Sequence, residues 1–297
     1  MLVEESMGHE VTPSVASEQD RVNRRIYRAA NISRWYRSAA LDFTEALAFL
    51  KYQPAFAGRD VLDLGVGTGR TSRYLAPLAG RYVCVDSSPA MIAHVRTHLP
   101  GLDIRETDIR DLNPFAAGSF DFVLASCNLL DAVSHQDRLR ALAEIWRVLR
   151  PAGVFMFSAH NRRWRSALHG PRLARARNPA SQALLVWRYV RSLVNHARVR
   201  RYRRLEREYA VLNDSGHDYA ALHYYIDRDT QRRQLEEAGF RLCEVLDVRG
   251  RSLQEGDDDR DSPSLMYVAE RAATTGVGGG VQPPAGPRDR RPAAESN

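Results

Sequence analysis

The stretch VLDLGVGTGR, residues 61–70, decides the fold, because an apolar run carrying one acid ends in three alternate glycines. Its first half is a predicted strand, and a helix is expected to begin at about Arg70. Glycine adopts positive φ and lets a ligand approach the backbone, so Gly65, Gly67 and Gly69 indicate a binding turn. The G-x-G-x-x-G fingerprint of dinucleotide-binding domains would place a glycine where this chain has Arg70.

Strands and helices alternate after this turn. Further strands are expected at 81–86, 102–106, 120–126 and 154–160, with helices beginning at Pro89 and spanning about 135–150. This succession predicts an α/β fold with a doubly wound, mostly parallel sheet and helices on both faces. Ligands of such sheets bind beyond the carboxyl ends of the strands, beside the first one, which is where the glycines lie.

Composition is ordinary for a globular protein, with 44% hydrophobic and 27% charged residues among 297. We expect a cytoplasmic protein, because the sequence shows neither a signal peptide nor an apolar run of roughly 20 residues. Cys84, Cys127 and Cys243 are too few and too far apart for a disulfide framework. Residues 1–20 and 272–297 are predicted disordered tails around a domain at 21–271.

Two acids follow the next strands at positions suited to a nucleoside. Asp86 ends the second strand, and a carboxylate there can accept hydrogen bonds from both ribose hydroxyls. Asp108 follows the third strand, where an adenine edge would lie. Asp63 precedes the glycines within the first strand. Together these acids predict a nucleoside-containing ligand.

At these residues the sequence resembles the class I S-adenosylmethionine-dependent methyltransferases. The matching segments are VLDLGVGTGR, VDSSPAMI, TDIRDL, FDFVLAS and EIWRVLRPAGVFMFS, and the resemblance covers roughly residues 25–270. It implies a seven-stranded sheet, closed by the helix and strand of LEEAGFRLCEV and the antiparallel strand SLMYVAER. It also implies S-adenosylmethionine as cofactor.

The resemblance assigns cofactor contacts to residues that follow the strands. Asp63 and the loop with Gly65, Gly67 and Gly69 would face the methionine part, and Asp86 would hold the ribose. The remaining implied contacts are Asp108 to the adenine amino group, the Ile109 backbone and Met91 against the adenine ring, and Ser126 at the methionine end.

The residues that would contact the methyl acceptor are less well determined by the sequence. His160 and His217 are candidate general bases, since imidazole titrates near neutral pH; the alternative for each is a structural hydrogen bond. Candidate acceptor contacts are Tyr36, Asn128, Asn161, Arg162 and Tyr224, although tyrosines at strand spacing would equally be core. His217, Asp218 and His223 lack the spacing of a helical or finger-like metal site, so no metal is predicted.

A basic insertion follows the fifth strand. Residues 162–207 contain fourteen arginines and one acid, and 162–210 is predicted to be a helical lid. Within it, residues 184–208 form a candidate amphipathic helix with a stripe of Leu185, Tyr189, Leu193 and Ala197. The alternatives are a solvated helix, or a surface for an anionic acceptor, RNA or an acidic membrane.

The sequence therefore favours a methyltransferase acting on a small-molecule acceptor, with O- and N-methylation both open. An anionic acceptor is expected if the arginines of the insertion contact it. An RNA methyltransferase is the second hypothesis, supported by the insertion but by no recognisable RNA-binding module. A non-catalytic S-adenosylmethionine-binding protein is the third. A nicotinamide oxidoreductase fits least, because Arg70 breaks the fingerprint.

Overall fold

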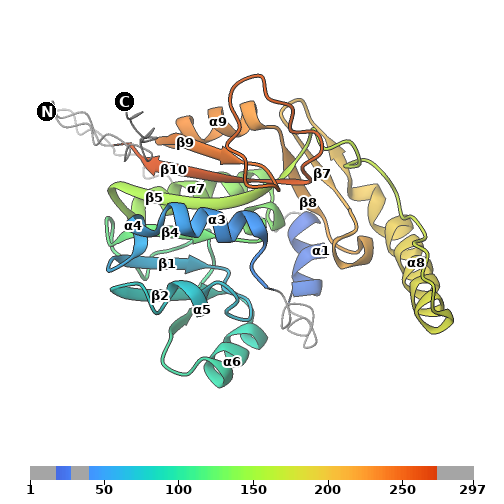
Figure 1. Ribbon diagram of the computed structural model, residues 1–297, viewed down its shortest axis with the longest axis horizontal. Coiled ribbons are helices and arrows are strands. Elements are labelled where there is room, and N and C mark those ends of the chain that lie inside the picture. The colour runs from blue at the N-terminus through green and yellow to red at the C-terminus, as the bar shows by residue number, and fades with distance from the viewer. Residues whose placement is uncertain (1–17, 28–39, 273–297) are drawn as a thin grey trace, which may run out of the picture.

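The computed structural model describes residues 18–27 and 40–272, and it contains one mixed sheet (Figure 1). The sheet has ten strands in the order β3-β2-β1-β4-β5-β8-β7-β6, with β10 branching from β5 and pairing with β9. The parallel strands that open the fold are β1 (Asp60–Leu64), β2 (Arg81–Asp86), β3 (Asp103–Glu106), β4 (Phe120–Ala125) and β5 (Leu149–Asn161).

All seven predicted strands are present, but the predicted strand count is too low. β9 (Phe240–Leu246) and β10 (Ser264–Arg271) are the closing pair, and β10 runs antiparallel to both β5 and β9. The three additional strands are β6 (Arg204–Leu205), β7 (Tyr209–Leu212) and β8 (His223–Ile226). They extend the sheet because β8 pairs in parallel with the last two residues of β5.

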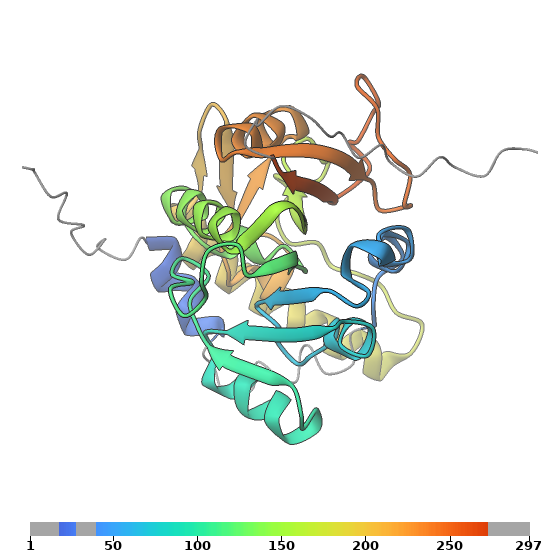
Figure 2. The ribbon, with the colours of Figure 1, turned by 90° about the vertical axis from the view of Figure 1, so that its left-hand side faces the viewer.

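Helices cover both faces of the sheet, as predicted. One face packs on α3 (Phe43–Lys51), α4 (Gln53–Phe56), α5 (Ser72–Leu75) and α6 (Pro89–His98), and the other on α7 (His135–Val148) and α9 (Arg228–Glu237). Alternate residues of a strand face the two layers. In β1, Val61 packs in the core on the α3–α6 side, and Leu62 and Leu64 pack in the core on the α7 and α9 side. Figure 2 shows α3 and α7 on opposite sides of the sheet.

Helix α1 (Glu18–Tyr27) lies beyond the carboxyl ends of the parallel strands (Figure 1). Asn23 fastens it there by donating to the carbonyls of Ala132 and Leu222, both at 2.7 Å. Residues 18–20, predicted as part of a tail, form the first turn of this helix. The rest of the two predicted tails, residues 1–17 and 273–297, lie outside the described residues.

The insertion holds α8 (Pro179–Val199), which is shorter than the predicted helix. Asn178 caps its start by accepting the backbone N–H groups of Ala180 and Ser181. The chain leaves the helix after Val199 because Arg204 and Leu205 pair with β7. The predicted stripe is also wrong in part: Leu185 and Tyr189 are half-buried, whereas Leu193 and Ala197 face solvent.

Among residues 18–27 and 40–272, no helix combines the length and the apolar run that crossing a bilayer requires.

Candidate functional site

A cavity of about 460 Å³ opens at the carboxyl ends of β1, β2 and β4, beneath α1. Gly65 and Gly67 from the first turn line it, together with the predicted nucleoside ligand Asp86. The structure brings eight of the nine predicted cofactor residues to this wall; the others are Asp63, Met91, Asp108, Ile109 and Ser126. Gly69 lies outside the lining. Their roles toward a ligand remain predictions.

The three loop positions require glycine for different physical reasons, although all three residues have positive φ. A Cβ on Gly65 would lie 2.4 Å from Leu129, and one on Gly69 would lie 2.3 Å from Leu99. Both positions are therefore closed to side chains by packing. A Cβ on Gly67 would meet only the Gly65 carbonyl, at 3.9 Å. The space at Gly67 is open, as a loop that admits a ligand requires.

Asp86 is fixed by the glycine loop. Its carboxylate accepts the N–H of Gly67 at 2.9 Å and the N–H of Ser88 at 2.8 Å. Burial raises the pKa of Asp86 above its ordinary value, while these backbone hydrogen bonds oppose the rise. A carboxylate has about four acceptor positions, so Asp86 retains capacity for a ligand's hydroxyl groups.

Asp63 supports the loop from below. Its buried carboxylate accepts hydrogen bonds from the hydroxyls of Thr71, at 2.7 Å, Ser72 and Tyr82. These bonds occupy the side chain that the resemblance turned toward the methionine. Burial raises the pKa of Asp63 to about 6. The folded protein therefore holds a proton on this group at mildly acidic pH, where the unfolded chain does not.

Replacing Asp63 by Asn is expected to remove part of the pH dependence of stability. Because its folded pKa is raised, Asp63 favours folding below about pH 4, and this contribution is lost as pH rises to about 6. The loss amounts to about 3 kcal/mol in the wild type. Denaturant unfolding at pH 4 and pH 7 should show that Asp63→Asn lacks it. Equal pH dependence in the two proteins would contradict the raised pKa.

Asp108 is paired within the protein. Arg110 donates to its carboxylate from two nitrogens, at 2.6 and 2.9 Å. Burial opposes ionisation, but this guanidinium more than offsets it and lowers the pKa of Asp108. Arg110 also reaches Asp20 on α1. Arg110 thus ties the expected adenine end of the cavity to the covering helix.

Two further residues at the methionine end were not predicted. Arg70 lines the cavity and donates to Glu45 at 2.7 Å and to the Ser126 hydroxyl at 2.8 Å. Glu45 is buried on α3 and forms a capping box with Asp42. Residues 42–45, DFTE, carry the acid-x-x-Glu form of that motif, so the sequence contained a signal. This motif predicts the start of a helix but indicates no role for Glu45 at the site.

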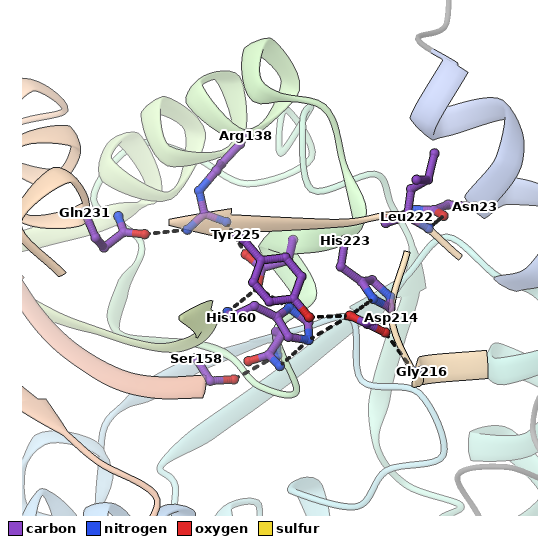
Figure 3. A network of polar contacts seen from close by, with 12 residues as sticks. Asn23, Arg138, Ser158, His160, Asp214, Gly216, Leu222, His223, Tyr225 and Gln231 are labelled. Atoms are coloured by element: carbon purple, nitrogen blue, oxygen red, sulfur yellow. Dashed lines mark hydrogen bonds and ion pairs between the residues drawn. The ribbon is translucent and has the colours of Figure 1, made fainter. Parts of the chain in front are cut away.

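His160 belongs to a buried polar network behind the cavity (Figure 3). Asn128, which lines the cavity, places its side-chain amide 3.2 Å from His160 Nε2. On the other side of the ring, Nδ1 lies 2.7 Å from Asp131 Oδ2. Asp131 is balanced by the fully buried Arg138, at 2.6 Å. The carboxylate therefore fixes Nδ1 as the protonated nitrogen and leaves the Nε2 lone pair toward Asn128.

A second acid faces the same imidazole. Asp214 accepts from His223 at 2.8 Å and from the Tyr225 hydroxyl at 2.7 Å, and it lies 3.8 Å from His160 Nε2. Burial opposes charge on both partners, yet their mutual attraction lowers the pKa of Asp214 and raises that of His223. Asp214 and His223 thus form an ion pair beside His160 (Figure 3).

His217 is a poorer candidate base than His160. Its ring lies edge-on to Tyr27 of α1, with the centroids 5.3 Å apart. Burial, together with the nearby His223, lowers the pKa of His217 to about 4. His217 is therefore neutral at pH 7, and it is a weak base.

Three predicted acceptor residues lie away from the cavity. The Asn161 amide donates to the carbonyls of Asp259 and Ser262. Arg162 donates to the carbonyls of Glu206 and Arg207, which joins β5 to the insertion. Tyr224 points to the opposite face of β8 and contacts His135 at 2.8 Å. Its neighbour Tyr225 faces the His160 network instead, and Tyr36 lies outside the described residues.

The possible metal ligands noted in the sequence, His217, Asp218 and His223, are not the group that the structure brings together. Asp218 is bound by Arg188 and Arg191, so it is unavailable to a metal. Ligand atoms of His160, Asp214 and His223 instead lie within 4.8 Å of one another. The hydrogen bonds and ion pair described above already engage this trio.

Comparisons with known proteins match the part of the chain that carries these motifs. Residues 62–157 match the methyltransferase domain family. A probable S-adenosylmethionine-dependent methyltransferase of Mycolicibacterium smegmatis is 38% identical over 107 residues, covering 36% of this chain and 40% of the relative. The malonyl-[acyl-carrier protein] O-methyltransferase of Pectobacterium atrosepticum is 36% identical over 123 residues, with 41% and 47% covered. The chain thus spans less than half the length of these relatives.

Solved structures extend the likeness in fold over most of the chain. The 1,6-didemethyltoxoflavin-N1-methyltransferase of Burkholderia thailandensis superposes with a TM-score of 0.54 at 15% identity, covering 90% of this chain and 98% of the other. An S-adenosylmethionine-dependent methyltransferase of Clostridium acetobutylicum gives 0.55 at 14% identity, covering 82% and 98%. Residues 62–157 thus match a methyltransferase domain, and the chain has the class I, Rossmann-like fold seen in S-adenosylmethionine-dependent methyltransferases.

Proposed function

We propose that the protein transfers a methyl group from S-adenosylmethionine to a small-molecule acceptor. The observation that carries the proposal is the convergence of an open glycine loop and a buried, backbone-braced Asp86 on one cavity. The residues present fit this cofactor, since the space at Gly67 is clear and Asp86 keeps acceptor capacity. A loop of this kind need not hold a pyrophosphate, in agreement with Arg70 in place of a glycine.

The chain's own residues hold and orient the cofactor. When bound, S-adenosylmethionine supplies an electrophilic methyl group on a sulfonium. Asp86 would accept the ribose hydroxyls, and Arg70 offers a cation to the carboxylate of the methionine part. Met91 and Ile109 supply apolar contact for the adenine. Since methyl transfer needs little covalent assistance, orientation and exclusion of water by α1 provide most of the acceleration.

His160 is the residue we assign to the acceptor's proton. Asp131 holds its tautomer, and Asp214, 3.8 Å from Nε2, would stabilise the imidazolium once a proton is taken. Asn128 links this nitrogen to the cavity wall. An acceptor hydroxyl, or an amine that must lose a proton, would reach Nε2 by displacing the Asn128 amide. This geometry is that of an oriented imidazole base.

A small acceptor is favoured by the size of the cavity, about 460 Å³, and by the relatives. α1 lines one side of the cavity, and the hydroxyl of its Tyr27 lies 3.3 Å from His223 Nε2. Similar proteins bear names that specify malonyl-[acyl-carrier protein] and 1,6-didemethyltoxoflavin as acceptors. RNA remains the second candidate because of the arginines of residues 162–207.

Transfer of isotope-labelled methyl groups tests this function. The protein is incubated with labelled S-adenosylmethionine and with separate pools of carboxylic acids, phenols, amines and total RNA. We expect label in one small-molecule pool and in no RNA. Label confined to RNA would support the second candidate. Binding of the cofactor without transfer to any pool or to a complete metabolite extract would indicate a non-catalytic binding protein.

A further inference from the structure

The outward side of α8 is an apolar surface. Six of the fifteen large hydrophobic residues exposed in the described chain lie on this one helix. Their exposed fractions run from 41% to 58%, and Trp187, at 56%, is the largest side chain among them. The six are Leu184, Val186, Trp187, Val190, Leu193 and Val194.

Five of the six, all except Leu184, lie on a continuous stripe. Positions 183, 186, 187, 190, 193, 194 and 197 are all apolar and follow the i, i+3, i+4, i+7 spacing of one helix face. The stripe is about 21 Å long at 1.5 Å per residue. The opposite face packs on the protein: Ser192 is buried, and Asn195 donates to the Asp218 carbonyl. Packing against the body therefore accounts for only one side of α8.

Charge around the stripe has a single sign. Residues 162–205 contain thirteen arginines and no acid. Six of these arginines are exposed and form no ion pair within the described part of the chain: Arg172, Arg175, Arg177, Arg198, Arg200 and Arg201. They lie before the helix start and at its end, so positive charge borders the apolar stripe at both ends.

We propose that this surface, residues 172–200, docks on an anionic membrane. Apolar side chains with a tryptophan, bordered by arginines, match the boundary between lipid headgroups and acyl chains. A second copy of the chain is a poor occupant, because two segments of like charge would face each other. RNA accounts for the arginines but gives no reason for an exposed Leu–Val–Trp stripe.

The surface lies next to the acceptor side of the site. α8 projects from the end of the molecule beyond α1 (Figure 1). Arg188 and Arg191 bind Asp218, whose neighbour His217 contacts Tyr27 at the cavity. A docked α8 would therefore bring the acceptor side close to the bilayer. Docking itself depends on residues 172–200 and does not rest on methyl transfer.

Vesicle flotation with the full chain tests the proposal. We expect binding to vesicles of equimolar phosphatidylcholine and phosphatidylglycerol, little binding to phosphatidylcholine alone, and weaker binding as salt rises. Trp187→Ser/Val190→Ser/Val194→Ser should reduce the partition constant about 100-fold, because three apolar side chains no longer enter the interface. Arg175→Gln/Arg177→Gln/Arg198→Gln/Arg200→Gln should reduce binding to the anionic vesicles by at least about 10-fold.

The matched control is Leu50→Ser/Tyr74→Ser/Leu139→Ser, three exposed apolar residues elsewhere, which should bind like the wild type. Circular dichroism and S-adenosylmethionine affinity show whether each variant is folded. Trp187→Phe should retain binding and lose the blue shift that vesicles induce in tryptophan fluorescence. Wild-type affinity in the serine triple variant, or absent vesicle binding, overturns the proposal. The proposal is also overturned if the wild type forms a dimer, or binds RNA, and the serine triple variant has lost that property.

Discussion

Asp86→Ala is expected to weaken S-adenosylmethionine binding by about 10²–10⁴-fold. Two ribose hydroxyls would lose a charged acceptor, and hydrogen bonds to charged groups contribute roughly 1.5–3 kcal/mol each. The same change leaves the N–H groups of Gly67 and Ser88 without the carboxylate that holds the loop. Calorimetric titration of the variant measures the loss directly.

Controls separate ligand contact from general damage. Asp103→Ala removes an exposed carboxylate on the neighbouring strand β3 that pairs with the exposed Arg105, so this variant should bind the cofactor normally. Gly67→Val fills the open space at the loop and should also abolish binding. Normal affinity in both Asp86→Ala and Gly67→Val would show that the cavity is not the cofactor site.

His160→Ala is expected to reduce kcat by about 10²–10⁴-fold for an acceptor that must lose a proton. Cofactor affinity should stay near the wild-type value, because His160 lies behind Asn128 and outside the cavity lining. Asp131→Asn should reduce kcat as well, by releasing the tautomer that Asp131 fixes. His217→Ala should cost less than about 10-fold, since a group with a pKa of about 4 is a weak base.

The pH–rate profile distinguishes a base from a structural histidine. For an acceptor that must lose a proton, wild-type kcat should rise with pH along an acidic limb, and this limb should be missing in His160→Ala. A variant that loses stability but keeps both kcat and the limb would show that His160 only packs in the core. Loss of activity in His217→Ala with a normal His160→Ala would transfer the role to His217.

The fold was largely predictable because its determinants are local. A strand, three alternate glycines and a helix are contiguous in 60–75, and the same alternation of strand and helix repeats through 161. Residues 200–208, the end of the predicted helix, were mispredicted for the opposite reason. Arg204 and Leu205 continue a helical pattern in sequence, but pairing with β7 removes them from the helix. Such long-range pairing leaves little trace in local periodicity.

The motifs placed eight of the nine predicted cofactor residues on the cavity wall, whereas most of the predicted acceptor residues lie elsewhere. Tyr224 was chosen where Tyr225 faces the network, because alternate residues of a strand point to opposite faces and the sequence does not say which face is inward. Asn161, on the adjacent strand β5, was mispredicted for the same reason: its side-chain amide donates to the carbonyls of Asp259 and Ser262. Asp214 and Glu45 reach the site only through tertiary packing.

Calorimetric titration of the wild-type protein tests the central claim most directly. S-adenosylmethionine, S-adenosylhomocysteine and NAD are titrated separately into the full chain. The account predicts saturable binding of the first two, with one molecule per chain, and no heat of binding with NAD. Binding of NAD, or the absence of binding by both S-adenosyl compounds, would contradict it.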